Sequence, residues 1–199
     1  MSESERIDRR SALGRCVAAA GSACALARTG RAAESPPPAE AAGGMAYGTL
    51  GNAKISRLML GGNLVSGYMH ARDLSYVNRL FRAYVTEEKI FETFRIAEAR
   101  GINTVLESGA NLVAKYNKQY GGRMQIIPSI HPEVGQPVQK LKDEIAAKVD
   151  QGCAALYIWG VAGDNLTRLG ALDRIAEAVE LTKAHNVAIG VGCHSLEVV

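Results

Sequence analysis

Two kinds of apolar pattern alternate along the chain from Met45 onward. Short, nearly continuous apolar runs are separated by segments in which apolar residues recur every three or four positions. The first pattern is typical of strands buried on both faces and the second of helices that cover them. The apolar runs predict strands over residues 58–62, 103–107, 124–130, 154–159 and 187–192. The helical patterns predict helices from Thr86 to Gly101, over 111–119 and 137–150, and through Leu169, Leu172, Ile175, Ala176 and Val179.

The spacing of the strands indicates the fold class. Starts near residues 124, 154 and 187 are 30 and 33 residues apart, which is the length of one strand–helix unit. Strands buried on both faces favour a parallel sheet between helices. We expect an α/β fold of the (β/α)8 TIM-barrel type, truncated to roughly five βα units because a closed barrel takes about 250 residues. A doubly wound sheet is the alternative, although no GxGxxG follows the first strand.

Two segments stand outside this repeat. Residues 47–58 predict a small β-hairpin that turns at Gly51-Asn52. Residues 63–85 form a long connection that carries several arginines, Arg72 among them. We favour an extra amphipathic helix over 74–81, with arginines that face water. The alternative is a binding loop whose arginines hold a carboxylate or phosphate.

The first 44 residues differ from the rest. They are rich in Ala and Arg, and Arg9-Arg10 precede a short, weakly apolar run over 17–27 and a Pro-rich stretch at 36–38. This order resembles a twin-arginine export signal followed by a linker. We therefore expect residues 1–44 to be a signal peptide and linker without a fixed fold, and 45–199 to be a partial (β/α) barrel domain in the periplasm. A disordered tail on a cytoplasmic protein is the alternative.

Composition and charge limit the classes of partner. The chain has 199 residues, of which 47% are hydrophobic and 22% charged, as in one soluble globular domain. Its net charge of +3, from 23 basic and 20 acidic residues, predicts no strongly basic face and no nucleic-acid partner. No stretch reaches the roughly eighteen apolar residues of a membrane span. Four cysteines without CxxC spacing argue against a zinc ribbon, and Cys153 and Cys193 belong to opposite ends of the sheet, too far apart for a disulfide.

The opening of this domain resembles a known family. Residues 47–63, YGTLGNAKISRLMLGGN, are similar to the start of the aldo/keto reductase superfamily, in which a hairpin covers the bottom of a barrel and the first strand ends in glycines. Ala99-Arg100-Gly101-Ile102-Asn103 resembles the family's approach to its second strand. The resemblance implies a TIM barrel that reduces carbonyl compounds with NADPH, using an Asp, a Tyr, a Lys and a His.

The residues of that chemistry are not found at the matching positions. The family's Asp falls on Leu106, its Tyr on Asn111 and its His on Trp159 or Gly160, while the third strand ends without a Lys. A Tyr proton donor assisted by a Lys is therefore not aligned in this chain. The resemblance supports the fold, and NADP is implied as a cofactor by family likeness alone.

In parallel barrels, function lies at the carboxyl ends of the strands. Glu107, His131 and His194 fall there and are the predicted catalytic residues, either as acid and base or as ligands of a divalent metal. A small-molecule substrate is expected to contact Asn63, Arg72, Trp159 and Asp164. The alternative is that these side chains only cap helices, bond to backbone or, for Trp159, fill the core.

Three functions follow as hypotheses. The first is an exported aldo/keto-reductase-like barrel protein, an NADP-linked oxidoreductase by ancestry. The second is a barrel isomerase, lyase or hydrolase that uses a metal with Glu107, His131 and His194. The third is a non-catalytic barrel fragment. In each case, bare sheet edges favour self-association.

Overall fold

The computed structural model describes residues 44–107 and 110–198. The predicted export signal, with Arg9 and Arg10, lies outside the described residues. Within them the chain is a mixed α/β structure with a four-stranded parallel sheet, a two-stranded hairpin and seven α-helices. The elements are β1 (Tyr47–Leu50), β2 (Ala53–Ser56), α2 (Asn63–Ser66), α3 (Ser75–Tyr84), α4 (Glu87–Ala99), β3 (Thr104–Glu107), α5 (Ala110–Tyr120), β4 (Gln125–Ile130), α6 (Val138–Asp150), β5 (Leu156–Ile158), α7 (Gly160–Arg168), α8 (Leu172–Lys183), β6 (Ile189–Val191) and the 3-10 helix η1 (Leu196–Val198).

The sheet places its strands in the order of the sequence, β3-β4-β5-β6, and every pair is parallel. Leu60 adds a fifth segment beside β3: its N–H donates to the Thr104 carbonyl at 2.9 Å, and its carbonyl accepts from the Leu106 N–H at 2.8 Å. The predicted strand over 58–62 is wrong in its extent. Only Leu60 pairs, and Leu58 is 58% exposed, because α2 begins directly after the two glycines.

One face of the sheet is covered by helices. Val105 of β3 packs with Phe91 and Phe94 of α4 and with Tyr116 of α5 in one buried cluster. Ile130, Leu156 and Ile158 pack with residues of α6 and α8 in a second cluster, which includes Leu141, Ile145 and Ala178. Thr86, at the start of the predicted helix, caps α4, since its Oγ1 accepts from the Lys89 backbone N–H. The apolar side chains that recur every 3.6 residues thus face the sheet, as the sequence predicts.

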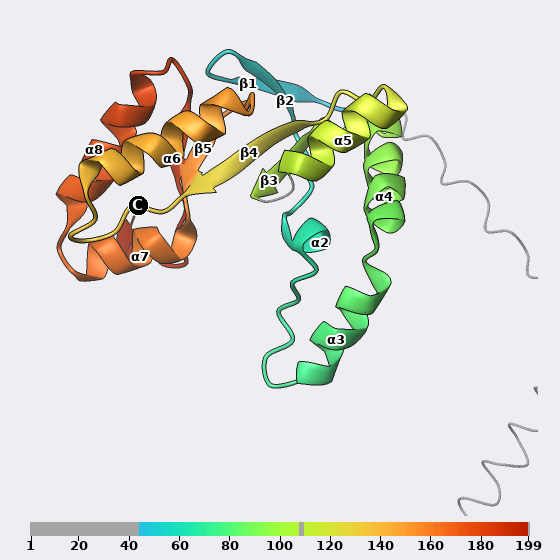
Figure 1. The fold of residues 1–199 in the computed structure, drawn as a ribbon, viewed down its shortest axis with the longest axis horizontal. Coiled ribbons are helices and arrows are strands. Elements are labelled where there is room, and N and C mark those ends of the chain that lie inside the picture. Colours follow the sequence, from blue (N-terminus) through green and yellow to red (C-terminus); the bar gives the residue numbers. More distant parts are fainter. Residues whose placement is uncertain (1–43, 108–109, 199) are drawn as a thin grey trace, which may run out of the picture. The chain divides into compact units, whose positions relative to one another are not determined.

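The opposite face of the sheet carries a smaller cluster, closed at one end by the hairpin. Ile55 of β2 packs with Ile127 and Ala155, which alternate with the helix-facing residues of their strands. The Lys54 carbonyl accepts hydrogen bonds from the side-chain amides of Asn103 and Gln125, at the amino ends of β3 and β4. Figure 1 shows the hairpin at the end of the sheet opposite to α7. The other end of the sheet is therefore the one that can carry a site.

Two connections differ from simple loops. The predicted helix over 74–81 is confirmed as α3, in which no residue is buried. The single helix expected through Leu169–Val179 is wrong: α7 and α8 are separate, because Gly170 adopts φ +68° and Leu169 lies in the turn.

Cys153 and Cys193 are both free, as predicted. Among the described residues, no helix has the length and apolar character needed to cross a bilayer.

Candidate active site

The carboxyl ends of the strands surround a cavity of about 640 Å³. Four of the predicted site residues line it, and they come from four places in the fold: Asn63 begins α2, Glu107 ends β3, Trp159 follows β5 and His194 follows β6. Parallel strands bring their carboxyl ends to one edge, and this explains the convergence. The other lining residues are Ser66, Tyr68, His70, Arg82, Tyr157, Gly160, Val161, Gly192 and Cys193.

Glu107 is held at the end of β3 by unusual backbone geometry. Its φ is +86°, a conformation that L-residues rarely adopt. The chain after the first strand passes directly against it, since a β-carbon at Gly62 would lie 2.5 Å from the Glu107 Cβ and 2.7 Å from the Leu106 carbonyl oxygen. A glycine at 62 is thus required for this close approach. Of the Gly61-Gly62 pair that suggested family likeness, Gly62 thus has a local packing function, whereas a β-carbon at Gly61 would meet no atom within 4 Å.

A chain of hydrogen bonds runs from Glu107 to a helix. The buried Ser129 hydroxyl lies 3.1 Å from Glu107 Oε1 and 3.4 Å from His131 Nε2. The other ring nitrogen of His131, Nδ1, lies 2.8 Å from Glu144 Oε1 of α6, and the backbone N–H of His131 donates to Glu144 Oε2 at 3.3 Å. Ser129 and His131 share a face because they are two residues apart at the end of a strand. This arrangement joins two carboxylates through one hydroxyl and one imidazole.

His194 forms a second imidazole–carboxylate pair. Its Nδ1 lies 2.6 Å from Asp164 Oδ2, and its backbone N–H donates to Asp164 Oδ1 at 2.9 Å. These two hydrogen bonds, the backbone one first, lower the pKa of the Asp164 carboxyl from its ordinary value. The His194 ring lies against Gly160, where a β-carbon would be 2.9 Å from Cε1. The pair fixes the imidazole, and Nε2 is the nitrogen left to exchange a proton with a ligand in the cavity.

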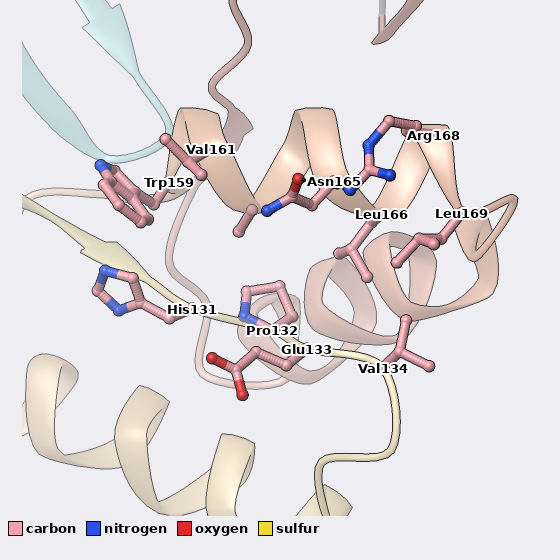
Figure 2. A pocket seen from close by; sticks show the side chains of 11 residues that line it. His131, Pro132, Glu133, Val134, Trp159, Val161, Asn165, Leu166, Arg168 and Leu169 are labelled. Carbon is pink, nitrogen blue, oxygen red and sulfur yellow. Dashed lines mark hydrogen bonds between the residues drawn. The ribbon is translucent and has the colours of Figure 1, made fainter.

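A second cavity, of about 310 Å³, adjoins the same edge. His131 and Trp159 lie together at one end of it, with ring centroids 5.5 Å apart (Figure 2). His131 therefore lies at the same edge as Glu107 and His194 but lines the adjoining cavity rather than theirs. His131 is linked to the larger cavity through Ser129, which bonds to Glu107, and through its ring contact with Trp159.

The remaining predicted residues lie in different places relative to the two cavities. Asp164 contacts His194 and lines neither of these two cavities. Arg72 lines neither of the two cavities and lies in a turn with φ +51°, so its predicted substrate contact has no support. Arg82 of α3, another arginine of the 63–85 connection that we expected to face water, lines the larger cavity.

Sequence reasoning missed Ser129 and Glu144. The two-residue alternation of a strand could have found Ser129, since it places that hydroxyl on the side of His131. No sequence signal points to Glu144, which comes from the middle of α6 and meets His131 only because that helix docks on the sheet.

Neither of the two imidazole–carboxylate pairs is part of a larger ligand set. Over residues 44–107 and 110–198, no group of three or more His, Cys, Asp or Glu side chains is arranged to hold a metal ion. No protein-family model, curated protein or solved structure matches the chain.

Proposed function

We propose that this chain is a small-molecule isomerase of the acid–base type, acting at the carboxyl ends of its parallel strands. One observation carries the proposal: Glu107 and the Asp164-anchored His194 line the same cavity, one contributing a carboxylate and the other an imidazole. A pair of titratable groups in different environments is what proton transfer in both directions requires. The cavity has the size of a small-ligand site.

The proposed step moves protons and nothing else. The Glu107 carboxylate removes a proton from the hydroxyl-bearing carbon next to a substrate carbonyl, and the carbon–hydrogen electron pair forms the double bond of an enediol. His194, in its protonated form, donates from Nε2 to the carbonyl oxygen. Glu107 then returns the proton to the former carbonyl carbon, and the substrate's original hydroxyl loses its proton to the now neutral His194, which completes an isomerisation without a net oxidant or reductant. The Asp164 carboxylate stabilises the imidazolium that this cycle needs.

Ser129 and His131 give Glu107 a path for its proton. When Glu107 is protonated, it can donate to the Ser129 oxygen while the Ser129 hydroxyl donates to His131 Nε2; the reverse set of donors leaves Glu107 ionised and His131 protonated beside Glu144. In both arrangements, every donor in this chain of hydrogen bonds has an acceptor. We therefore assign Ser129 a positioning and relay function and His131 that of a proton store.

The test is solvent exchange in D2O. Purified full-length protein is incubated with a panel of small α-hydroxy ketones and aldehydes, and deuterium at the carbon next to the carbonyl is followed by NMR. We expect exchange with the wild type, and a loss of roughly 10²- to 10⁴-fold in Glu107→Gln and His194→Gln, the usual contribution of a general acid or base. His185→Gln is the matched control, because His185 is exposed and lies between α8 and β6, at the amino end of β6. Equal exchange in wild type and Glu107→Gln would refute the proposal.

The reductase ancestry is a second candidate, and with it a TIM-barrel fold. Two observations favour it: the strands follow one another in sequence order with helices on one face, and the hairpin bonds to the amino ends of β3 and β4. Right-handed connections between consecutive parallel strands put the helices on one side, as in a barrel wall. The substitution of Leu106 and Asn111 for the family's Asp and Tyr speaks against its chemistry. A fluorescence titration with NADPH tests it: saturable binding supports a reductase, and its absence supports the isomerase.

Localisation and self-association are also proposals. Replacement of Arg9 and Arg10 by lysine should keep the full chain out of the periplasm if the twin-arginine route carries it, and unchanged fractionation would contradict that route.

Because β6 is paired on one side only among the described strands, we propose that this edge joins copies of the chain. A monomer in sedimentation at working concentrations would contradict it.

A further inference from the structure

We infer that the cavity of about 310 Å³ beside His131 is an apolar subsite of the proposed active site, which takes an aromatic ring or a branched alkyl group of the substrate. The inference rests on the proposed function for the identity of the polar end of that substrate. It adds the chemical class of the molecule: an α-hydroxy carbonyl compound that carries an apolar group beside its reacting carbons.

The side chains of this cavity suit an apolar ligand. Trp159 stands at one end and Leu166 and Leu169 at the other, with Val134 and Pro132 on the strand side (Figure 2). A cavity of about 150 Å³ lined by such residues is enough for benzene, so this one has room for a substituted ring. An indole face and aliphatic side chains bind a ring mainly by excluding water from it.

The subsite is continuous with the larger cavity. Trp159 and Val161 line both hollows, so the two meet at these side chains. Trp159 is 39% exposed, although a tryptophan in a core would be covered. A molecule that places its reacting carbons near Glu107 and His194 can therefore extend past the indole ring into the subsite. The two hollows differ in character: the subsite presents mainly apolar surface, with His131, Glu133, Asn165 and Arg168 also among its lining residues, and the larger cavity is more polar.

The loop that walls the subsite is held in place before any ligand binds. Arg174 of α8 donates from Nε to the Glu133 carbonyl at 3.2 Å and from Nη2 to the Gln136 carbonyl at 3.0 Å. The Arg174 side chain also pairs with Glu177 one turn along its helix and is 14% exposed. The loop from Pro132 to Gln136 thus cannot close without breaking these bonds, and a preformed pocket avoids an ordering cost on binding.

The experiment uses Trp159, the single tryptophan of the chain, as its reporter. Full-length protein is titrated with benzyl alcohol, with 3-phenyllactate and with lactate, and emission and acrylamide quenching are recorded. Benzyl alcohol should shift the emission saturably and protect the indole from acrylamide. Leu169→Asp should weaken that binding roughly tenfold, the scale of losing one leucine contact. Leu172→Asp is the matched control, since Leu172 is 56% exposed against 59% for Leu169 but does not line the cavity.

The two-part ligand separates the subsite from the catalytic proposal. 3-Phenyllactate should bind more tightly than lactate, and Leu169→Asp should reduce that advantage while leaving lactate unaffected. Wild-type binding of benzyl alcohol by Leu169→Asp, or equal affinity for 3-phenyllactate and lactate, would overturn the inference. Glu107→Gln should still bind benzyl alcohol as the wild type does, because Glu107 does not line the subsite. Failure of deuterium exchange with intact benzyl alcohol binding would therefore refute the isomerase and leave the apolar site standing.

Discussion

The imidazole of His194 lies 2.6 Å from the carboxylate of Asp164, which precedes it by 30 residues. Asp164 belongs to α7, and His194 follows β6. Both carboxylate oxygens are used, one by the ring and one by the backbone N–H. Such double attachment fixes the tautomer and the direction of an imidazole, and so decides which nitrogen faces the cavity.

Asp164→Asn tests this anchoring. The amide keeps the size of the side chain but loses the charge that stabilises the imidazolium, so we expect deuterium exchange to fall roughly 10²- to 10⁴-fold while the fold persists. The pKa of Asp164 is lowered in the folded state, so its contribution to stability is present above the ordinary value of 3.8 and is lost as pH falls through the lowered value. Urea unfolding between pH 5 and 2 should show this acid-dependent loss in the wild type and a weaker one in the variant. An unchanged exchange rate in Asp164→Asn would contradict the anchoring function.

Gly160→Ala should displace His194 without unfolding the protein. A β-carbon there would lie 2.9 Å from Cε1 and 3.3 Å from Nδ1 of His194. Alanine is the better helix former in α7, by up to about 1 kcal/mol, so we expect unchanged thermal stability with exchange reduced at least about tenfold. Gly190→Ala is the control, since its β-carbon would meet only Tyr157 Cβ, at 4.0 Å. Full activity in Gly160→Ala would show that the ring does not need its present position.

Ser129→Ala should interrupt the hydrogen-bond chain between Glu107 and His131. In the wild type we expect the imidazole ¹⁵N signals of His131, one of 4 histidines, to move when Glu107 is replaced by Gln. In the Ser129→Ala background that response should vanish, because no hydroxyl connects the two side chains. Ser129→Thr keeps a hydroxyl and should restore it. A response that survives in Ser129→Ala would mean that His131 senses Glu107 through space rather than through Ser129.

Tyr116→Phe should remove an alkaline loss of stability. Burial, followed by its hydrogen bond to Glu98, raises the pKa of Tyr116 to about 12 from 10.0. The unfolded chain therefore releases this proton first, and the stabilisation that is complete below pH 10 is lost as pH rises toward 12. Phenylalanine should cost about 1 kcal/mol at neutral pH and flatten the alkaline decline in urea titrations. Tyr120→Phe, at a ring 55% exposed, should leave that decline unchanged. The same steep decline in Tyr116→Phe would assign it to another group.

Periodicity and spacing were enough to predict much of the fold. The four paired strands of the sheet lie within the predicted ranges, and the hairpin turns at Gly51 with φ +57°, where only a glycine or a similar residue is comfortable. They also placed Glu107, Asn63 and His194 at one edge, because parallel strands end together. The apolar pattern gave wrong element boundaries where glycines interrupt the structure: Gly170 separates α7 from α8, and Gly61-Gly62 follow a first strand reduced to Leu60.

The sequence by itself determined the strands, their parallel direction and the edge at which polar side chains gather, since periodicity and the spacing of strand–helix units can be read along the chain. Only the tertiary structure decided the partners: Asp164 for His194, Glu144 for His131, and a separate apolar cavity behind Trp159. Those pairings depend on how α6 and α7 dock against the strand ends, to within about an ångström. Hydrophobic periodicity selects which face of a helix is buried, but the depth and rotation of docking come from packing among many residues far apart in the chain.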